Sequence, residues 1–268
     1  MNGKSVMLPT SELADFEAQP FKVLDDDSMQ ELAESIRNVG VLVPIIVRRM
    51  ENGRYEIISG HRRKRACELA GISEIPATVM ELNDDEAAIM LVDSNLQREN
   101  LLPSEKAYAY KLKLDALRHQ GKEGEFDESA DAIGKKDSKS GRQIRRYVRL
   151  TELIYPLLDK VDLKIIPVTA GAEVSFLNVK LQVTLNDQIE FYECRLNLKQ
   201  AATLKKHYLD GTLDGSVVRE ILLDYDETTA ISLNYKKLRA YFPQDYTAKQ
   251  CEAALWEILD QWHQNQCA

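Results

Sequence analysis

The sequence predicts an α+β protein with three parts: an α/β domain at residues 1–102, an all-α domain containing a helix-turn-helix at 103–177, and a mainly helical region at 178–268. Two observations predict this class. Runs of β-branched or alternating apolar residues at 43–48, 55–59 and 75–79 are separated by helical patterns. Beyond residue 103, apolar side chains recur mainly at helical spacing.

The composition is ordinary for a globular protein, with 268 residues, 44% hydrophobic and 29% charged. It contains no apolar run of about 18 residues, so we expect no transmembrane helix and no membrane partner. The start, MNGKSVMLPTSEL, lacks the apolar core of a secretory signal, which favours a cytoplasmic location. The four cysteines are far apart and the histidines are scattered, which predicts free thiols and no metal-ligand spacing.

The net charge of −8 argues against a generic nucleic-acid binder, but the charge is unevenly distributed. Residues 1–103 carry 11 basic and 18 acidic side chains, a net of −7. Residues 104–150 carry 12 basic and 8 acidic side chains, a net of +4. A basic middle between acidic flanks is typical of a DNA-contacting module, because only one face must meet phosphates.

The first hundred residues contain several turn and cap signals. Residues 6–24 predict a short strand and an extended loop. Ser28–Glu31 is interpreted as a capping box that begins a helix ending at Gly40. Asn52-Gly53 predicts a hairpin between the first two apolar runs. Asn83 or Asp84 is expected to cap the helix that follows the third run.

The most informative stretch is YEIISGHRRKRACELA at residues 55–70. It predicts a strand, a turn at Gly60, and a helix whose first turn carries His61, Arg62 and Arg63. Free N–H groups at a helix start, the helix dipole and arginine forks together favour a bound anion, and glycine allows a phosphate to come close. The alternative is a solvated basic face on a surface helix.

A second polar cluster follows the next predicted helix, at Ser94-Asn95-Leu96-Gln97-Arg98-Glu99-Asn100-Leu101. An amide and a carboxylate at a helix end can ligate Mg²⁺ or hold a nucleotide. They can equally cap the helix. The residues alone do not choose between these interpretations.

The segment RQIRRYVRL at 142–150 predicts a recognition helix. Arg142, Arg145, Arg146 and Arg149 fall within an arc of about 100° on a helical wheel, opposite the apolar side chains. Such a stripe suits guanine edges and phosphates in a DNA groove. The further candidate DNA contacts are Lys139 and Gln143. A solvated charged face is the alternative, although four arginines without a neighbouring acid would repel one another.

The remainder predicts mainly helices. Segments 154–161 and 170–177 are expected to pack behind the helix-turn-helix, and 198–207 and 216–223 are also expected to be helical. Residues 179–185 alternate like a strand between helical patterns and are ambiguous. The pattern at 246–266 predicts a helix with one apolar face, which suits a core or a dimer contact.

Three stretches together resemble the ParB/Spo0J/Noc family of partition proteins. Residues 60–66, GHRRKRA, resemble the family's GERRxRA motif, and residues 95–101, NLQRENL, resemble its ENxQRxxL motif. The helix-turn-helix follows in the expected place. Gln19-Pro20 is similar to the QPR box, with Phe21 in the arginine position. The resemblance covers about residues 6–177 and favours a plasmid or conjugative-element type.

The resemblance implies a CTP-binding N-terminal domain that closes as a clamp between two protomers. Gly60, Arg62 and Arg63 would hold the triphosphate and Asn95 would ligate Mg²⁺. The other residues implied in this site are Gln19, His61, Gln97 and Arg98. It also implies a palindromic double-stranded DNA site, a homodimer, a possible ParA-type ATPase partner and a nucleoid- or plasmid-associated location in the cytoplasm.

Two departures from the family pattern concern the nucleotide chemistry. The motif glutamates are replaced by His61 and Ser94. Losing two carboxylates should weaken metal binding and water positioning, so a CTPase activity is left open while nucleotide binding is expected. The helix-turn-helix turn at 135–141 is also about four residues longer than usual, so base specificity is not carried over.

Two other classes of function compete with this one. The same fold hosts sulfiredoxin-like ATP chemistry, small-molecule kinases and nucleases, and His61 in the phosphate turn would suit an acid or base near neutral pH. Alternatively, the chain is a transcription regulator that binds DNA independently of any nucleotide.

Overall fold

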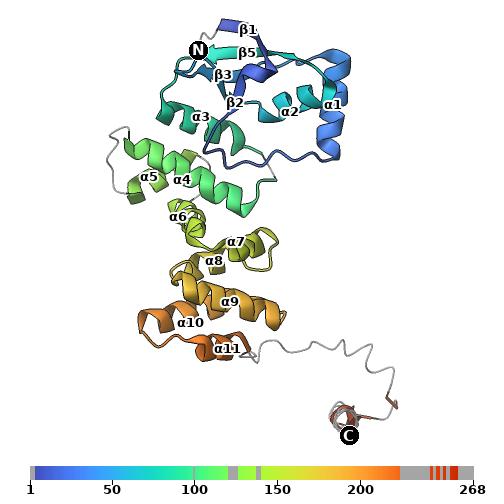
Figure 1. Ribbon diagram of the computed structural model, residues 1–268. Helices are drawn as coiled ribbons and strands as arrows, with labels where there is room; N and C mark the ends of the chain where they lie inside the picture. The colour runs from blue at the N-terminus through green and yellow to red at the C-terminus, as the bar shows by residue number, and fades with distance from the viewer. Residues whose placement is uncertain are drawn as a thin grey trace. The chain divides into compact units, whose positions relative to one another are not determined.

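The computed structural model describes residues 4–98, 100–119, 126–136 and 140–223, together with short pieces between 242 and 258. The chain divides into two compact units, residues 1–223 and 224–268. The first unit holds a five-stranded sheet followed by a series of helices (Figure 1). The expected helix at 246–266 lies mostly outside the described residues.

The sheet has the strand order β1-β5-β3-β4-β2. Its strands are β1 (Lys4–Pro9), β2 (Leu13–Asp15), β3 (Ile45–Arg49), β4 (Tyr55–Ser59) and β5 (Glu74–Met80). β3 pairs antiparallel with β4 through the predicted hairpin, and parallel with β5. β1 pairs antiparallel with β5, and the short β2, which the sequence did not predict, pairs parallel with β4.

Helices cover the sheet because each buries an apolar face. α1 (Asp27–Val39) and α2 (His61–Ala70) pack on the core that contains Ile45, Val47 and Ile57. α3 (Asp84–Asn95) packs through Leu91 and Val92 in a second cluster with Ile58. Along β3 the buried residues alternate, so Ile45 and Val47 lie on the same face of the sheet. In β4 the consecutive residues Ile57 and Ile58 are both buried, so their side chains lie on opposite faces.

The helices beyond residue 102 pack on one another (Figure 1). They are α4 (Pro103–His119), α5 (Phe126–Lys136), α6 (Gly141–Arg149), α7 (Tyr155–Asp162), α8 (Val168–Val174), α9 (Val179–Phe191), α10 (Leu198–Leu209) and α11 (Gly215–Leu223). Several main contacts skip a helix in the sequence, such as those of α4 with α6, α6 with α8, and α8 with α10. α7 to α11 share a single apolar cluster that includes Leu157, Val174, Leu185 and Leu204. The boundaries at 102/103 and 177/178 stay predictions, and helices on both sides of 177/178 contribute to this cluster.

Most predicted helices are present, one ambiguous segment is resolved, and one predicted cap is corrected. Residues 179–185 belong to a helix, because every third or fourth side chain, Gln182, Leu185 and Ile189, is buried. The capping box at Ser28 is wrong, since the cap of α1 is Asp26. A carboxylate oxygen of Asp26 accepts a 2.9 Å hydrogen bond from the Met29 backbone N–H and a 2.8 Å bond from the Ser28 hydroxyl.

Candidate functional site

The turn between β4 and α2 is built around Gly60. Its φ of 111° is in the region that L side chains rarely adopt, and a Cβ there would lie 2.5 Å from Ile45 Cγ2. Glycine therefore allows the chain to leave the sheet and begin a helix directly against β3. In the first turn the Arg63 N–H donates to the Gly60 carbonyl at 2.8 Å, which leaves the N–H groups of His61 and Arg62 as the free backbone donors at the start of α2.

A cavity of about 180 Å³ opens at this turn. Seven of the eight residues expected in the nucleotide site line it, namely Gln19, Gly60, His61, Arg62, Arg63, Asn95 and Arg98. The eighth, Gln97, is exposed and does not belong to the lining given for this cavity. Segments nearly eighty residues apart in sequence thus meet at one anion-binding turn.

The two arginines of the cavity are held in place by the fold. Arg62 Nη2 donates a 2.6 Å hydrogen bond to the Ser28 hydroxyl and lies 3.8 Å from Asp26, at the cap of α1. Arg63 Nη1 donates to the carbonyls of Val43 and Pro44, the latter at 2.7 Å. A guanidinium has five N–H donors, so each arginine retains donors beyond these contacts. Burial lowers the pKa of Arg63 without an acidic partner to offset it.

His61 is a buried polar side chain of the cavity wall, with 8% of its surface exposed. Among the described residues, its Nε2 has no hydrogen-bond partner. Desolvation lowers the pKa of His61 to about 4, so the imidazole is neutral near pH 7. A neutral imidazole offers one N–H donor and one acceptor rather than a charge.

The polar groups at the end of α3 support a structural role as well as a ligand role. Asn95 Nδ2 donates a 2.8 Å hydrogen bond to the Leu91 carbonyl, and the Ser94 hydroxyl donates to the same carbonyl at 3.0 Å. The side-chain oxygens of the described cavity lining are the amide and hydroxyl oxygens of Gln19, Ser59 and Asn95. Magnesium held by a protein prefers at least one carboxylate, so these described donors do not fit a protein-bound Mg²⁺.

The other two basic residues of α2 are bound in ion pairs. Arg65 Nη2 lies 2.6 Å from Asp25 and Lys64 Nζ lies 3.1 Å from Asp15. Together with Glu68 and His61, these residues line a neighbouring cavity of about 170 Å³. The basic run 62–65 is therefore divided, with two arginines at the candidate anion site and two cations neutralised beside it.

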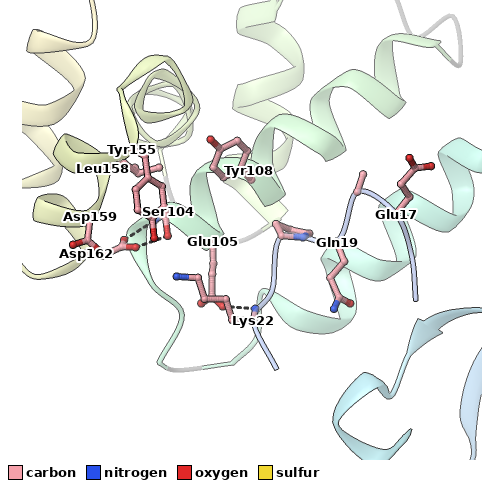
Figure 2. A pocket seen from close by; sticks show the side chains of 12 residues that line it. Glu17, Gln19, Lys22, Ser104, Glu105, Tyr108, Tyr155, Leu158, Asp159 and Asp162 are labelled. Atoms are coloured by element: carbon pink, nitrogen blue, oxygen red, sulfur yellow. Dashed lines mark hydrogen bonds between the residues drawn. The ribbon is translucent and has the colours of Figure 1, made fainter. Parts of the chain in front are cut away.

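A larger cavity of about 590 Å³ lies on the other side of the 17–22 loop, between that loop, α4 and α7 (Figure 2). Glu105 of α4 is 7% exposed and accepts hydrogen bonds from the backbone N–H groups of Lys22, at 2.8 Å, and Leu102, at 2.9 Å. Asp162 of α7 accepts a 2.8 Å bond from the Ser104 N–H. Because Gln19 and Lys22 line both cavities, the loop forms a wall that the two share.

The candidate recognition helix α6 presents only part of its basic stripe to solvent. Ser140 caps it by accepting a 3.2 Å hydrogen bond from the Gln143 N–H, and Ile144 is fully buried. Arg142 and Gln143 are exposed, whereas Arg146 is half-buried. Arg145 lies 3.3 Å from Asp131 of α5. Lys139 lies outside the described residues.

Arg149, at the end of α6, contacts the segment that follows α8. It donates hydrogen bonds of 3.1 Å to the Ser175 hydroxyl and 2.9 Å to the Ser175 carbonyl. Its guanidinium carbon lies 3.9 Å from the centre of the Phe176 ring. Arg149 therefore joins α6 to α8, in addition to any contact with DNA that the sequence predicts.

Sequence reasoning missed Phe21, Lys22, Val23 and Ser59 in the cavity lining. Lys22 follows the Gln19-Pro20-Phe21 segment directly, so a basic residue two positions after the proline was the available signal. The QPR pattern places its arginine at position 21, but this chain has Phe21 there, and the Phe21 ring is buried with 4% exposure.

Comparisons with known proteins match this chain to a family profile and to several relatives. A profile described as the ParB N-terminal domain matches residues 1–96. The nucleoid occlusion protein of Halalkalibacterium halodurans is 36% identical over 206 residues, which cover 76% of this chain and 68% of that protein. The chromosome-partitioning protein Spo0J of Thermus thermophilus is 34% identical over 201 residues, 75% and 70% of the two chains.

Among solved structures, the C-terminally truncated chromosome-partitioning protein ParB of Caulobacter crescentus is matched in two forms. The form complexed to the centromeric parS site has 23% identity and a TM-score of 0.46, covering 75% of this chain and 98% of the other. The form complexed with CTP-gamma-S has 27% identity and a TM-score of 0.34, covering 70% and 99%. In the described part of this chain, no helix has the length and hydropathy needed to cross a membrane.

Proposed function

Since the chain belongs to the ParB/Spo0J/Noc family, we propose that it is a sequence-specific DNA-binding protein of chromosome or plasmid partitioning, or of regulation, and that its N-terminal domain binds CTP. The proposal assigns nucleotide binding to the cavity at Gly60 and DNA binding to α6. Relatives named for nucleoid occlusion and chromosome partitioning support an action on DNA.

The observation that carries the nucleotide half is the convergence of two distant motifs on one cavity. Gly60, Arg62 and Arg63 from the β4–α2 turn line it together with Asn95 and Arg98 from the end of α3. A helix start, a positive-φ glycine and arginine side chains provide backbone donors and charge for a phosphate chain. CTP in particular is proposed from the family rather than from a base-reading contact.

The DNA half rests on α6. Arg142 and Gln143 are exposed side by side at its N-terminal end, the part of a recognition helix that reaches base edges. Arg145, Arg146 and Arg149 extend the basic face along the helix. We propose a palindromic site bound by a homodimer, a ParA-type ATPase as a partner, and a location on the nucleoid or a plasmid.

The test combines two measurements on the full chain. A thermal-shift screen of CTP, ATP, GTP and UTP, with and without DNA, should show the largest rise in melting temperature with CTP, because a ligand that binds only the folded form stabilises it by mass action. Footprinting on genomic fragments at physiological salt should reveal a preferred site. Absence of any preferred site would eliminate the DNA half, and absence of a CTP shift would eliminate the nucleotide half.

The protonation of His61 argues against the alternative that this protein is an enzyme with His61 as its acid or base. Its pKa of about 4 keeps the imidazole neutral and makes it a weak base at neutral pH. Phosphate release should therefore be slow with and without DNA. Rapid turnover that ignores DNA would favour the enzyme alternative instead.

A further inference from the structure

We infer that the phosphate chain of the nucleotide is neutralised by cationic side chains of the protein, including Lys22, and that its binding does not require a divalent cation. This inference rests on the proposed nucleotide-binding function and concerns the same cavity. It differs from the magnesium ion at Asn95 that the family resemblance implies.

Four cationic side chains line the cavity from three separate segments: Lys22, Arg62, Arg63 and Arg98. Every other described residue of the lining is apolar or neutral, counting His61 in its neutral form. The described lining thus carries an excess of positive charge. Charge-assisted hydrogen bonds to phosphate from such groups are about twice as strong as neutral ones.

Lys22 and Arg98 are the cations most available to a ligand. Both are exposed at the cavity rim, and within the described part of the chain no side-chain hydrogen bond or ion pair of either is observed. Arg62 and Arg63, by contrast, are oriented by Ser28 and by the carbonyls of Val43 and Pro44. The cavity therefore combines two guanidinium groups held by other residues, those of Arg62 and Arg63, with two exposed cations, Lys22 and Arg98, that can approach an anion.

The backbone at Lys22 is itself fixed, which makes its side chain a defined part of the site. Its N–H donates to the buried Glu105 carboxylate at 2.8 Å, so the chain cannot move away from α4 without breaking that bond. His61 is only 8% exposed, and its Nε2 has no hydrogen-bond partner among the described residues. This buried, unpartnered nitrogen is a second indication that the cavity wall meets a polar ligand.

The side-chain oxygens of the described cavity lining do not fit a metal site. Asn95 uses its amide nitrogen on the Leu91 carbonyl and presents one neutral oxygen. Asp26 lies 3.8 Å from Arg62 but does not belong to the described lining. Magnesium sites use one or two carboxylates together with phosphates, whereas these neutral oxygens supply no charge to the ion.

The experiment measures binding of CTP and of inorganic triphosphate to the full chain by isothermal titration calorimetry. Two buffers of equal ionic strength are compared, one containing Mg²⁺ and the other EDTA. We expect the affinity for each ligand to differ by less than about threefold between the buffers. A loss of more than about tenfold in EDTA would overturn the inference while leaving nucleotide binding established.

The test variants are Lys22→Ala and Lys22→Arg. The control is Lys180→Ala, at an exposed lysine of α9. Lys22→Ala should weaken both ligands by about tenfold because it removes one charge-assisted contact. Lys22→Arg should restore most of the affinity, and Lys180→Ala should leave it unchanged. An unchanged affinity in Lys22→Ala would overturn the assignment of Lys22. Lack of binding in both buffers would reject the nucleotide function together with this inference.

Discussion

Two short helices, α2 and α6, both begin with clustered basic side chains, but they present them differently. In α2, Arg62 and Arg63 are bound by Ser28, Val43 and Pro44 and line a small cavity. In α6, Arg142 and Gln143 stand exposed on the surface. A fixed cavity suits a compact ligand with a defined shape, whereas an open face suits a long groove. The same residue type therefore predicts charge, but only the packing around it predicts the ligand.

The first and largest test breaks the α2 side of this comparison. Gly60→Ala should cost about 2–5 kcal/mol of folding free energy and abolish nucleotide binding, because it combines a positive φ with a close contact to Ile45. Gly53→Ala is the matched control, since its φ of 83° is also positive but no atom lies within 4 Å of the added Cβ. Equal losses in the two variants, measured by urea unfolding, would contradict the role of the Ile45 contact.

The second test uses the burial that distinguishes α2 from α6. The pKa of His61 falls from 6.5 to about 4 on folding, so the unfolded chain takes up a proton that the folded chain resists between these pH values. Stability is full above pH 6.5 and falls as the pH drops through this window, by up to about 3 kcal/mol. Nearby Asp15 opposes the depression and Lys64 adds to it.

His61→Gln should therefore flatten the stability profile between pH 6.5 and 4 in chemical denaturation. His119→Gln, at a side chain that is 72% exposed, is the control for replacing a histidine at the surface. A His61→Gln profile that keeps the native slope would show that His61 is not buried in its neutral form.

The third test concerns the two ends of α6. Arg142→Ala should weaken binding to the cognate DNA by about 1–3 kcal/mol without altering the melting temperature, because the side chain is exposed. Arg149→Ala should lower both affinity and melting temperature, because Arg149 also binds Ser175 and packs on Phe176. Gel shifts paired with thermal melts measure both. If the two variants changed DNA affinity and melting temperature equally, Arg149 would have no structural role beyond that of Arg142.

The smallest expected effect tests the wall between the two cavities. Glu105→Gln keeps one carbonyl acceptor but loses the other, so it should cost about 1 kcal/mol and modestly weaken nucleotide binding. Glu152→Gln, on an exposed carboxylate, is a suitable control. A nucleotide affinity that is insensitive to Glu105→Gln would mean that the loop is held without this bond.

Much of the fold could be predicted because the relevant signals are local. The Asn-Gly turn, the Asn83 cap and the apolar spacing of α7, α8, α10 and α11 depend on neighbours in sequence. The short β2 could not be predicted, because its three residues are a strand only by pairing with β4. The pattern at 179–185 was ambiguous for a related reason, since burial against other helices rather than alternation decides its state.

The candidate site was predictable where motifs carried it and not where packing did. The turn and the helix start indicated an anion site at Gly60, Arg62 and Arg63 but left a solvated basic face open, and the resemblance to the family motifs assigned these residues together with Asn95 and Arg98. Lys22 lines the cavity from a loop whose backbone is held by Glu105, 83 positions away in sequence. The bond from Arg149 to Ser175 spans 26 positions. Neither distance is encoded in a local pattern.

The strand order has a practical consequence for handling this protein. β1 and β2 are separated by only three residues, Thr10–Glu12, yet they occupy opposite margins of the sheet. Trimming residues 4–15 during vector design would strip β5 and β4 of their outer neighbours in one cut. β5 and β4 would then be edge strands with unpaired backbone N–H and C=O groups. Such edges pair with strands of other molecules, so the trimmed protein should aggregate.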